Sequence, residues 1–384
     1  MNMKWKLIIF SLIATLLLTN LPLKVEASVS VSARNAILME QESGRVLFEK
    51  KAHEKRRIAS ITKIMTAILA IESGKLEEMV KVSDRAEGTE GSSLYLKKNE
   101  KIKLEDLVYG LMLRSGNDAA VAIAEHVGGS LEGFVFLMNQ KADEIGMANS
   151  HFANPHGLDD SENHYSTAYD MAILTKYAME NDTYRKIAGT EVHRAPNPNE
   201  KWDRVWRNKN RLLTGLYDYS TGGKTGYTKL AKRTLVSTAS KGDMNLIAVT
   251  LNGPDDWKDH IGMFEMAFKH YDMVQVVKAG KIKKIKDDFY KKKIFFDHDF
   301  SYPVTGDEKD LFEVEIQLQK PQETWEEERN VPNVVGKAII RFDEKPIKEL
   351  PVYYEYEDED EEDSSFFEKF RSLFTAMTGV KDNG

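Results

Sequence analysis

The sequence predicts an α+β protein: an antiparallel sheet covered by helices, followed by a small all-β domain. Short β-like segments occur near the start of the chain and again after residue 230, whereas helical periodicity fills the region between them to about residue 180. Strict alternation of apolar and polar residues returns beyond residue 276. Strands at both ends of a helical region indicate one sheet that is built from distant segments.

The first 27 residues have the layout of a signal peptide. Lys4 and Lys6 precede an apolar run over residues 7–18, and Ala27 ends a segment of the kind that signal peptidase cleaves. The run is shorter than the roughly 20 residues that a membrane-spanning helix needs. We therefore predict a signal peptide and a secreted mature protein that starts at Ser28, with an uncleaved N-terminal anchor as the alternative.

Composition limits the chemistry that is open to the protein. The 384 residues are 41% hydrophobic, as in ordinary globular proteins, and contain no cysteine, so neither disulfides nor thiolate chemistry are expected. The net charge is −7, and residues 1–27 carry +2 of it, which leaves −9 for the mature chain. This acidic balance argues against nucleic acid as a partner.

Residues 28–275 are predicted to form the larger domain. Its expected elements are an N-terminal hairpin, helices after Ser60 and on both sides of Gly116, and two strands joined at a turn. The hairpin covers residues 36–39 and 45–48, and the two later strands cover residues 235–238 and 246–251.

Residues 276–355 are predicted to form the small all-β domain. Apolar and polar side chains alternate over residues 312–318, which is the pattern of a half-buried strand. The apolar segments 334–342 and 347–354 flank a turn and indicate a hairpin.

The C-terminal residues change character twice. Eight of the nine residues 355–363 are acidic, so residues 356–364 are predicted to be a solvated linker. Residues 365–378 place large apolar side chains at spacings of three and four, which predicts an amphipathic helix. We expect this helix to attach the protein peripherally to a membrane surface, and docking on the β domain is the alternative.

Ser60 and Lys63 form the first of three short motifs. A helix is expected to begin at Ser60, and residues three apart on a helix are neighbours, so the lysine amine can reach the serine hydroxyl. The helix N-terminus adds backbone N–H groups and a positive potential, and a neutral lysine could accept the serine proton. The alternative is an N-cap serine that is followed by a surface lysine.

Two further motifs supply polar groups. Ser115 and Asn117 flank a bend between predicted helices and could relay protons and hold a peptide amide; capping of the next helix is the alternative. Lys224 and Thr225, in a glycine-rich segment, suit a substrate carboxylate if they lie on a strand edge. A turn with an exposed lysine is the alternative. Each motif alone is a weak signal. The occurrence of all three in this order along the chain is a much more specific signal for an active site.

Ser-x-x-Lys, a Ser-x-Asn element and Lys-Thr-Gly are together the active-site set of penicillin-binding proteins and serine β-lactamases. The chain resembles the D-alanyl-D-alanine carboxypeptidase family of low-molecular-mass penicillin-binding proteins over roughly residues 33–252, and within it the sporulation-specific members. The segments that carry the resemblance are residues 57–67, 90–94, 113–120, 154–159 and 220–228. It implies a penicillin-recognising, serine β-lactamase-like catalytic domain at residues 28–275 and a β-rich second domain, often with a C-terminal membrane helix.

The resemblance also implies a role for each catalytic residue. Ser60 would be the acylated nucleophile, Lys63 its base, and Ser115 and Asn117 the proton relay and the holder of the substrate amide. The implied reaction removes the terminal D-alanine from peptidoglycan stem pentapeptides through an acyl-enzyme, with β-lactam antibiotics as covalent inhibitors. It needs no cofactor.

Four adjacent residues would bind the substrate. Lys224 and Thr225 would hold its carboxylate, next to Gly226, and the backbone N–H groups of Ser60 and Tyr227 would form an oxyanion hole. Some relatives carry histidine where this chain has Tyr227, so the substrate preference stays open.

Other functions fit the sequence less well. His156 and His164 lie in a polar loop, but no His-Glu-x-x-His pairing or similar ligand spacing is present, so no metal centre is expected and the loop is interpreted as a wall near the cleft. A β-lactamase usually adds a glutamate base, and neither Glu162 nor another glutamate can be assigned to that role. A non-catalytic peptidoglycan- or penicillin-binding protein would lack one of the motifs, whereas all three are intact.

Overall fold

The protein is described by a computed structural model over residues 29–283 and 285–356. The predicted signal peptide, the acidic linker beyond Tyr356 and the predicted C-terminal helix lie outside these residues. The chain divides into two compact units, the first ending at Met273 and the second beginning at Val274. In the described part of the chain, no single helix is long and apolar enough to cross a membrane, although two consecutive helices, bent by 84°, pass that test as a pair by length and composition.

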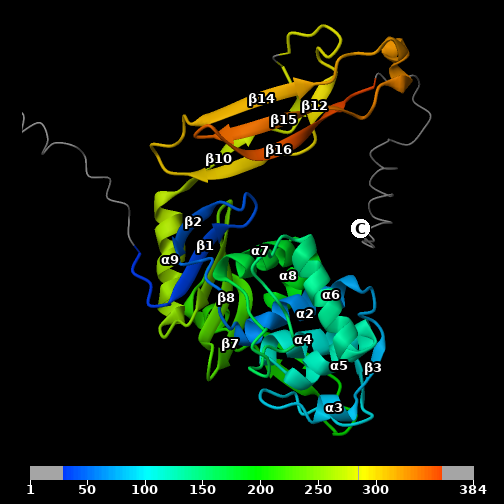
Figure 1. The fold of residues 1–384 in the computed structure, drawn as a ribbon, viewed down its shortest axis with the longest axis vertical. Helices are drawn as coiled ribbons and strands as arrows, with labels where there is room; N and C mark the ends of the chain where they lie inside the picture. Colours follow the sequence, from blue (N-terminus) through cyan, green and yellow to red (C-terminus); the bar gives the residue numbers. More distant parts are fainter. Residues whose placement is uncertain (1–28, 284, 357–384) are drawn as a thin grey trace, which may run out of the picture. The chain divides into compact units, whose positions relative to one another are not determined.

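A five-stranded antiparallel sheet forms the centre of the first unit, in the order β2-β1-β9-β8-β7 (Figure 1). Its strands are β1 (Asn35–Glu40), β2 (Val46–Lys50), β7 (Ser220–Thr228), β8 (Lys232–Lys241) and β9 (Met244–Leu251). The predicted hairpin is β1 and β2, and the two predicted later strands are β8 and β9. The prediction of one sheet from both ends of the domain is confirmed.

Both faces of this sheet are covered, which explains why consecutive side chains of β1 and β9 are buried along almost the whole of each strand. Ile37 and Met39 pack into the larger core under the helical layer, whereas Ala36 and Leu38 face the smaller core under α9 (Asp256–His270). Figure 1 shows α9 on one side of the sheet and the other helices on the opposite side. Alternate side chains of a strand point to opposite faces, so each face receives its own apolar set.

The helical layer positions the motifs. Its elements are the 3₁₀ turn η1 (Ala59–Thr62), α2 (Lys63–Glu72), α3 (Asp84–Glu87), α4 (Leu104–Arg114), α5 (Asn117–Gly128), α6 (Leu131–Glu144), α7 (Ala168–Met179) and α8 (Asp182–Ala188). All side chains of α2 from Lys63 to Ile71 are buried, so it is a central helix and its polar groups need internal partners.

Several elements of the first unit were not predicted. They include the helix α9, two short antiparallel pairs, β3 (Met79–Lys81) with β4 (Lys101–Lys103) and β5 (Val192–Ala195) with β6 (Arg204–Arg207), and the π-helical turn η2 (Leu212–Leu216). Strands of three or four residues are too short to show a clear alternation.

The second unit is built from β-strands around its own core. Its five-stranded sheet has the order β11-β12-β16-β15-β14, and β10 (Asp272–Val277) pairs with β13 (Phe300–Val304). The sheet strands are β11 (Gly280–Lys281), β12 (Ile294–Phe296), β14 (Phe312–Leu318), β15 (Val334–Phe342) and β16 (Lys345–Tyr354), with 3₁₀ turns η3 (Glu323–Glu326) and η4 (Glu328–Asn330). β14 matches the predicted half-buried strand, and β15 and β16 form the predicted hairpin.

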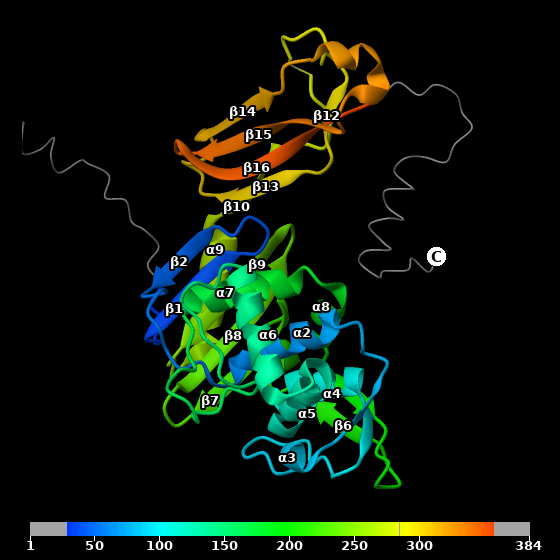
Figure 2. The ribbon, with the colours of Figure 1, turned by 45° about the vertical axis from the view of Figure 1, so that its right-hand side comes forward.

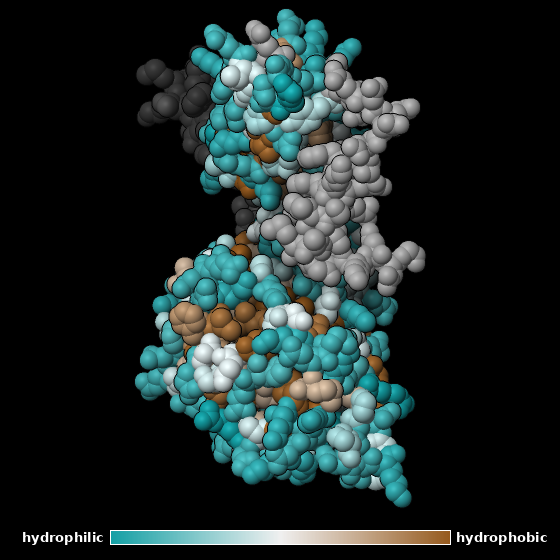
Figure 3. Space-filling model, turned by 90° about the vertical axis from the view of Figure 1, so that its right-hand side faces the viewer, coloured by the Kyte–Doolittle hydropathy of each residue, from teal (hydrophilic) through white to brown (hydrophobic). Residues whose placement is uncertain are grey.

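Some large apolar side chains remain exposed on the first unit. Those of Tyr95, Phe136, Trp202, Tyr227 and Leu230 are the most exposed in the described chain. Figure 3 shows one face of the molecule on which hydrophilic residues predominate and hydrophobic residues gather in a band over the first unit. Exposed aromatic residues on loops are candidates for binding a ligand.

Candidate active site

The nucleophile candidate Ser60 lies in η1, where the chain turns sharply before entering α2. Ala59 before it has a φ of 51°, a left-handed conformation that non-glycine residues rarely adopt. Thr62 Oγ1 donates to the Ala59 carbonyl at 2.8 Å and fixes this turn. Gly157, with a φ of 84°, packs directly against it, because a Cβ there would lie 1.9 Å from the same carbonyl oxygen. The loop that contains Gly157 therefore requires glycine at this position.

Lys63 Nζ lies within hydrogen-bond distance of three oxygens. They are Ser60 Oγ at 3.1 Å, Asn117 Oδ1 at 2.7 Å and the backbone carbonyl of His156 at 2.7 Å. A neutral amine carries two hydrogens and one lone pair, and an amide or carbonyl oxygen can only accept. Asn117 and His156 therefore take the two hydrogens, which leaves the lone pair for the Ser60 hydroxyl proton.

The electrostatic environment favours this neutral amine. Burial is the largest cause that lowers the pKa of Lys63 well below its usual value, and the positive charges of Lys224 and Lys209 lower the pKa further. The carboxylate of Asp118 acts in the opposite direction. The structure thus brings together the serine and lysine that the sequence singled out and gives the lysine the properties of a base.

Asn117 is held in one orientation. Its Nδ2 donates to the Glu90 carbonyl at 2.6 Å, so its Oδ1 faces Lys63. Ser115, at the end of α4, has a φ of 65°, and no hydrogen bond between described residues joins it to Ser60 or Lys63. The relay role of Ser115 therefore stays a prediction.

Asp118 is a site residue that none of the three sequence motifs includes. It is buried and accepts hydrogen bonds from Ser93 Oγ and from the backbone N–H groups of Leu94 and Leu96. These contacts fix the segment that follows Glu90 against the α4–α5 bend. Asp118 therefore shapes one wall of the site and also acts on the charge of Lys63.

Lys224 and Thr225 lie within β7, the edge strand of the sheet, so the alternative of a glycine-rich turn is wrong. Figure 2 shows this strand at the border of the sheet. Gly226 lets the strand approach the nucleophile closely, because a Cβ there would lie 2.9 Å from Ser60 N. Burial and then the charge of Lys209 lower the pKa of Lys224 to about 7. Its Nζ donates to the Thr225 carbonyl at 2.8 Å.

Lys209 is a second residue that the sequence analysis missed. Its Nζ lies 3.4 Å from Ser92 Oγ, and burial together with the charge of Arg114 lowers its pKa. It depresses the pKa of both Lys63 and Lys224. A lone lysine outside any motif gives no signal in one sequence, whereas its charge is evident once the three amines converge.

The polar loop with His156 and His164 forms hydrogen bonds with Thr62 and Lys63, next to the nucleophile. His164 Nδ1 accepts from the Ala153 N–H, so its Nε2–H donates to Thr62 Oγ1 at 2.8 Å. Burial lowers the pKa of His156 to about 3 and that of His164 to about 4, so both rings are neutral. Arg57 Nη1 lies 3.6 Å from Asp159 Oδ1 of this loop. In the described part of the chain, no group of three or more His, Cys, Asp or Glu could hold a metal ion.

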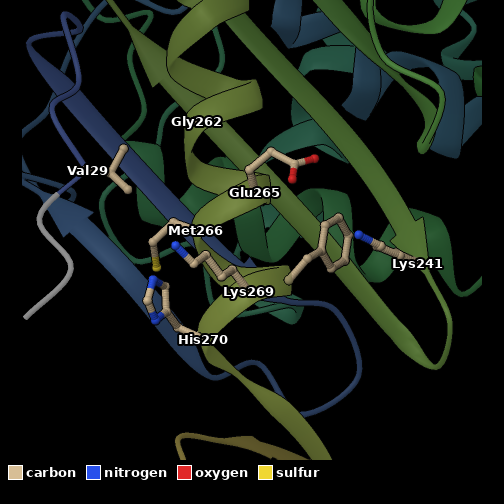
Figure 4. Close-up of a pocket in the computed structure, with 8 residues that line it drawn as sticks. Val29, Lys241, Gly262, Glu265, Met266, Lys269 and His270 are labelled. Carbon is tan, nitrogen blue, oxygen red and sulfur yellow. The ribbon is translucent and has the colours of Figure 1, made fainter.

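One cavity lies away from these residues. It has a volume of about 570 Å³ and is lined by Val29, Lys241 and residues of α9 such as Glu265 and His270 (Figure 4). Lys241 Nζ lies 5.7 Å from the centre of the Phe268 ring there. None of the predicted site residues lines this cavity.

A serine and a buried lysine one helical turn apart, beside the edge of an antiparallel sheet under a helical layer, define an acyl-transferring serine enzyme of the penicillin-recognising class. The model of the family described as D-alanyl-D-alanine carboxypeptidase (peptidase family S11) matches residues 23–255. A second model, described as the C-terminal domain of penicillin-binding protein 5, matches residues 271–360. The chain belongs to the D-alanyl-D-alanine carboxypeptidase family and is a serine-type carboxypeptidase.

Individual relatives agree with this assignment. The chain is 38% identical to the D-alanyl-D-alanine carboxypeptidase DacF of Bacillus subtilis over 69% of this chain and 71% of that protein. It is 37% identical to the carboxypeptidase DacC of Escherichia coli over 65% of this chain and 64% of that protein. The structure of penicillin-binding protein 5 from Haemophilus influenzae matches with a TM-score of 0.70 at 26% identity, over 86% of this chain and 98% of that one. Members of the family act on peptidoglycan outside the cytoplasm.

Proposed function

We propose that the protein removes the terminal D-alanine from peptidoglycan stem pentapeptides through an acyl-enzyme on Ser60. The observation that carries this proposal is the position of Lys63 Nζ, 3.1 Å from Ser60 Oγ with two obligate acceptors on its other side. Release of D-alanine from a stem pentapeptide by the purified protein tests it directly.

The proposed reaction has two halves. Ser60 Oγ attacks the carbonyl carbon of the penultimate D-alanine while Lys63 Nζ takes the hydroxyl proton, and the N–H groups of Ser60 and Tyr227 stabilise the oxyanion. The C–N bond then breaks, and the terminal D-alanine leaves as an amine that has received a proton, a transfer in which Ser115 takes part. Water next attacks the ester carbonyl and gives a proton to the neutral Lys63 amine. As the ester C–O bond breaks, Lys63 passes this proton to Ser60 Oγ, which frees the serine hydroxyl and the shortened peptide.

The same machinery supports covalent inhibition by penicillins. A β-lactam presents an acyl group and a carboxylate to Ser60 and Lys224, and its ester would form by the same attack on a carbonyl. A serine β-lactamase remains the rival function. Rapid turnover of a penicillin, with no stable labelled enzyme, would favour the β-lactamase instead.

Lys224 and Thr225 are proposed to bind the terminal carboxylate of the substrate. For this the Lys224 amine must be charged, whereas the Lys63 amine must be neutral. The value of kcat/KM should therefore rise with pH through the lowered pKa of Lys63 and fall as pH passes the pKa of Lys224, about 7 in the free enzyme. We expect a bell-shaped profile for a peptide that ends in D-Ala-D-Ala, measured as released D-alanine.

The matched control for this prediction is the same peptide with its terminal carboxylate esterified. Its profile should keep the acid limb and lose the alkaline limb, because it has no charge for Lys224 to bind. Lys224→Ala should weaken the binding of the carboxylate substrate by about 1.5–3 kcal/mol, the contribution of a hydrogen bond to a charged group. The same substitution should affect binding of the ester far less. Equal profiles and equal losses for both substrates would contradict a carboxylate site.

A role in spore-cortex peptidoglycan is proposed from the similarity to sporulation-specific members of the family. The relative from Bacillus subtilis, 38% identical, supports it. Analysis of cortex stem peptides in a strain that lacks the gene tests this role.

Secretion through residues 1–27 and peripheral membrane attachment through residues 365–378 are likewise proposed. Six large apolar side chains in the C-terminal segment each offer about 1.5–3 kcal/mol on full burial, which exceeds the cost of folding one short helix. We expect the mature protein to float with liposomes and a variant without residues 365–384 to stay in solution with unchanged activity on a soluble peptide. If the mature protein never floats, or if the truncation unfolds the β domain, docking of the helix is the better account.

A further inference from the structure

A groove in the first unit has no part in the proposed reaction. Its volume is about 490 Å³, and it lies between the β3–β4 pair and the loop that connects β5 to β6. Its lining includes Met79, Lys101, Lys103, Asp106, Asn197 and Trp202. We call it the Trp202 groove.

Buried polar contacts hold the loop wall of this groove in place. The carboxylate of Glu100 is fully buried and accepts from Arg204 Nη2 at 2.9 Å and from Asn199 Nδ2 at 3.0 Å. A buried carboxylate is costly unless it is paired, so these partners fix the β5–β6 loop against β4. On the floor, Asp106 lies 2.7 Å from His193 Nε2, and the His193 ring stacks on Tyr109. The groove is therefore formed before any ligand arrives.

The lining combines an exposed aromatic platform with polar groups. The Trp202 side chain is 67% exposed although its loop is anchored, and Met79 beside it is 55% exposed. An indole face packs against the C–H face of a sugar ring, and amide, carboxylate and ammonium groups bind the hydroxyl and acetamido groups at its edge. Ammonium and carboxylate groups both line the groove, and the amine of Lys103 is paired with Glu77 at 2.9 Å and with Glu105 at 2.9 Å. An aromatic platform with hydrogen-bonding groups of both kinds around it suits an N-acetylated amino sugar.

Both walls of the groove continue into the active site. In the segment before β4, the Glu90 carbonyl accepts from Asn117, and Ser93 Oγ donates to Asp118. In the segment after β6, the backbone N–H of Lys209 donates to the Leu113 carbonyl at 3.1 Å.

The stretch of α4 between the groove and the bend at Ser115 is about as long as the peptide part of a substrate. α4 runs from the groove at Asp106 to the bend at Ser115, nine residues that rise about 13 Å. The four residues of a stem peptide before the scissile bond span at most about 13–14 Å when extended. A stem that is bound at Ser60 can therefore present its sugar to the groove.

We propose that the Trp202 groove binds the glycan strand that carries the stem peptide, through its N-acetylated amino sugars. The inference rests on the proposed function and deepens it. The enzyme then cleaves glycan-linked stems in preference to free stem peptides.

The test compares a disaccharide-pentapeptide with the free pentapeptide. For Trp202→Ala, kcat/KM on the disaccharide-pentapeptide should fall about threefold to tenfold, the contribution of one aromatic contact, and should not change on the free peptide. Phe136→Ala is the matched control, because Phe136 on α6 is 68% exposed and does not line the groove. Equal losses on both substrates, or no loss on either, would overturn the proposal.

A binding measurement separates this proposal from the proposed function. Chitotetraose, an oligomer of N-acetylglucosamine, should bind the wild type and Phe136→Ala in saturation-transfer NMR and should lose binding in Trp202→Ala. An enzyme that cleaves neither pentapeptide but binds chitotetraose in this way would refute the proposed function and support the groove. Absence of binding to the wild type would overturn the groove as a glycan site.

Discussion

Replacing Ser60 by alanine is expected to abolish both the release of D-alanine and covalent labelling by a fluorescent penicillin. Both processes need the same new bond from Ser60 Oγ to an acyl carbon. Among the residues that the structure describes, no other hydroxyl forms a hydrogen bond with Lys63 Nζ. Loss of a nucleophile that acts as a unit with its base should lower kcat by at least about 10⁴-fold. The measurement is D-alanine release together with gel detection of the labelled protein.

The control for this prediction is a folded variant with intact chemistry. Ser240→Ala removes a hydroxyl from β8, outside the site, and should keep wild-type labelling. The Ser60→Ala protein should unfold at nearly the wild-type temperature, because Ser60 is partly exposed and the hydrogen bond that is lost, to Lys63 Nζ at 3.1 Å, lies within the site. Residual labelling of the folded Ser60→Ala protein would exclude Ser60 as the nucleophile.

Elements with a clear local period could be predicted from the sequence. The alternation over residues 312–318 specifies β14, and the continuous apolar run of β9 agrees with a strand that is covered on both faces. The spacing of Ser60 and Lys63 was sufficient to predict that they meet, because positions three apart on a helix are neighbours whatever the rest of the fold does.

Contacts between distant segments could not be predicted in this way. The carbonyl of His156 binds Lys63 across 93 positions, and any residue would offer the same carbonyl there. The sequence shows a glycine at position 157 but not why one is needed there. The requirement comes from the Ala59 carbonyl, which lies against Gly157 only in the folded chain. The roles of Asp118 and Lys209 likewise depend on burial and on other charges, which residue type and spacing do not specify.

Replacing Lys63 is expected to slow acylation strongly whether the new side chain is uncharged or positively charged. In Lys63→Ala no base remains, and in Lys63→Arg the guanidinium stays protonated and has no lone pair to accept the Ser60 proton. Loss of general-base catalysis should lower the acylation rate by about 10²–10⁴-fold in both variants. Stopped-flow labelling with a fluorescent penicillin measures this rate directly.

The two substitutions should also differ in stability, and the acylation rate of Lys63→Arg separates the role of base from a structural role. Arginine at this position places a permanent charge in a buried site that already lowers the pKa of lysine, next to the charge of Lys224, so Lys63→Arg should be the less stable variant. Lys81→Arg, at an exposed position of β3, is the matched control and should alter neither rate nor stability. A purely structural requirement for charge would instead let Lys63→Arg acylate at nearly the wild-type rate while Lys63→Ala failed. That outcome would mean that the Ser60 proton leaves by a route other than Lys63, because a buried guanidinium cannot accept it.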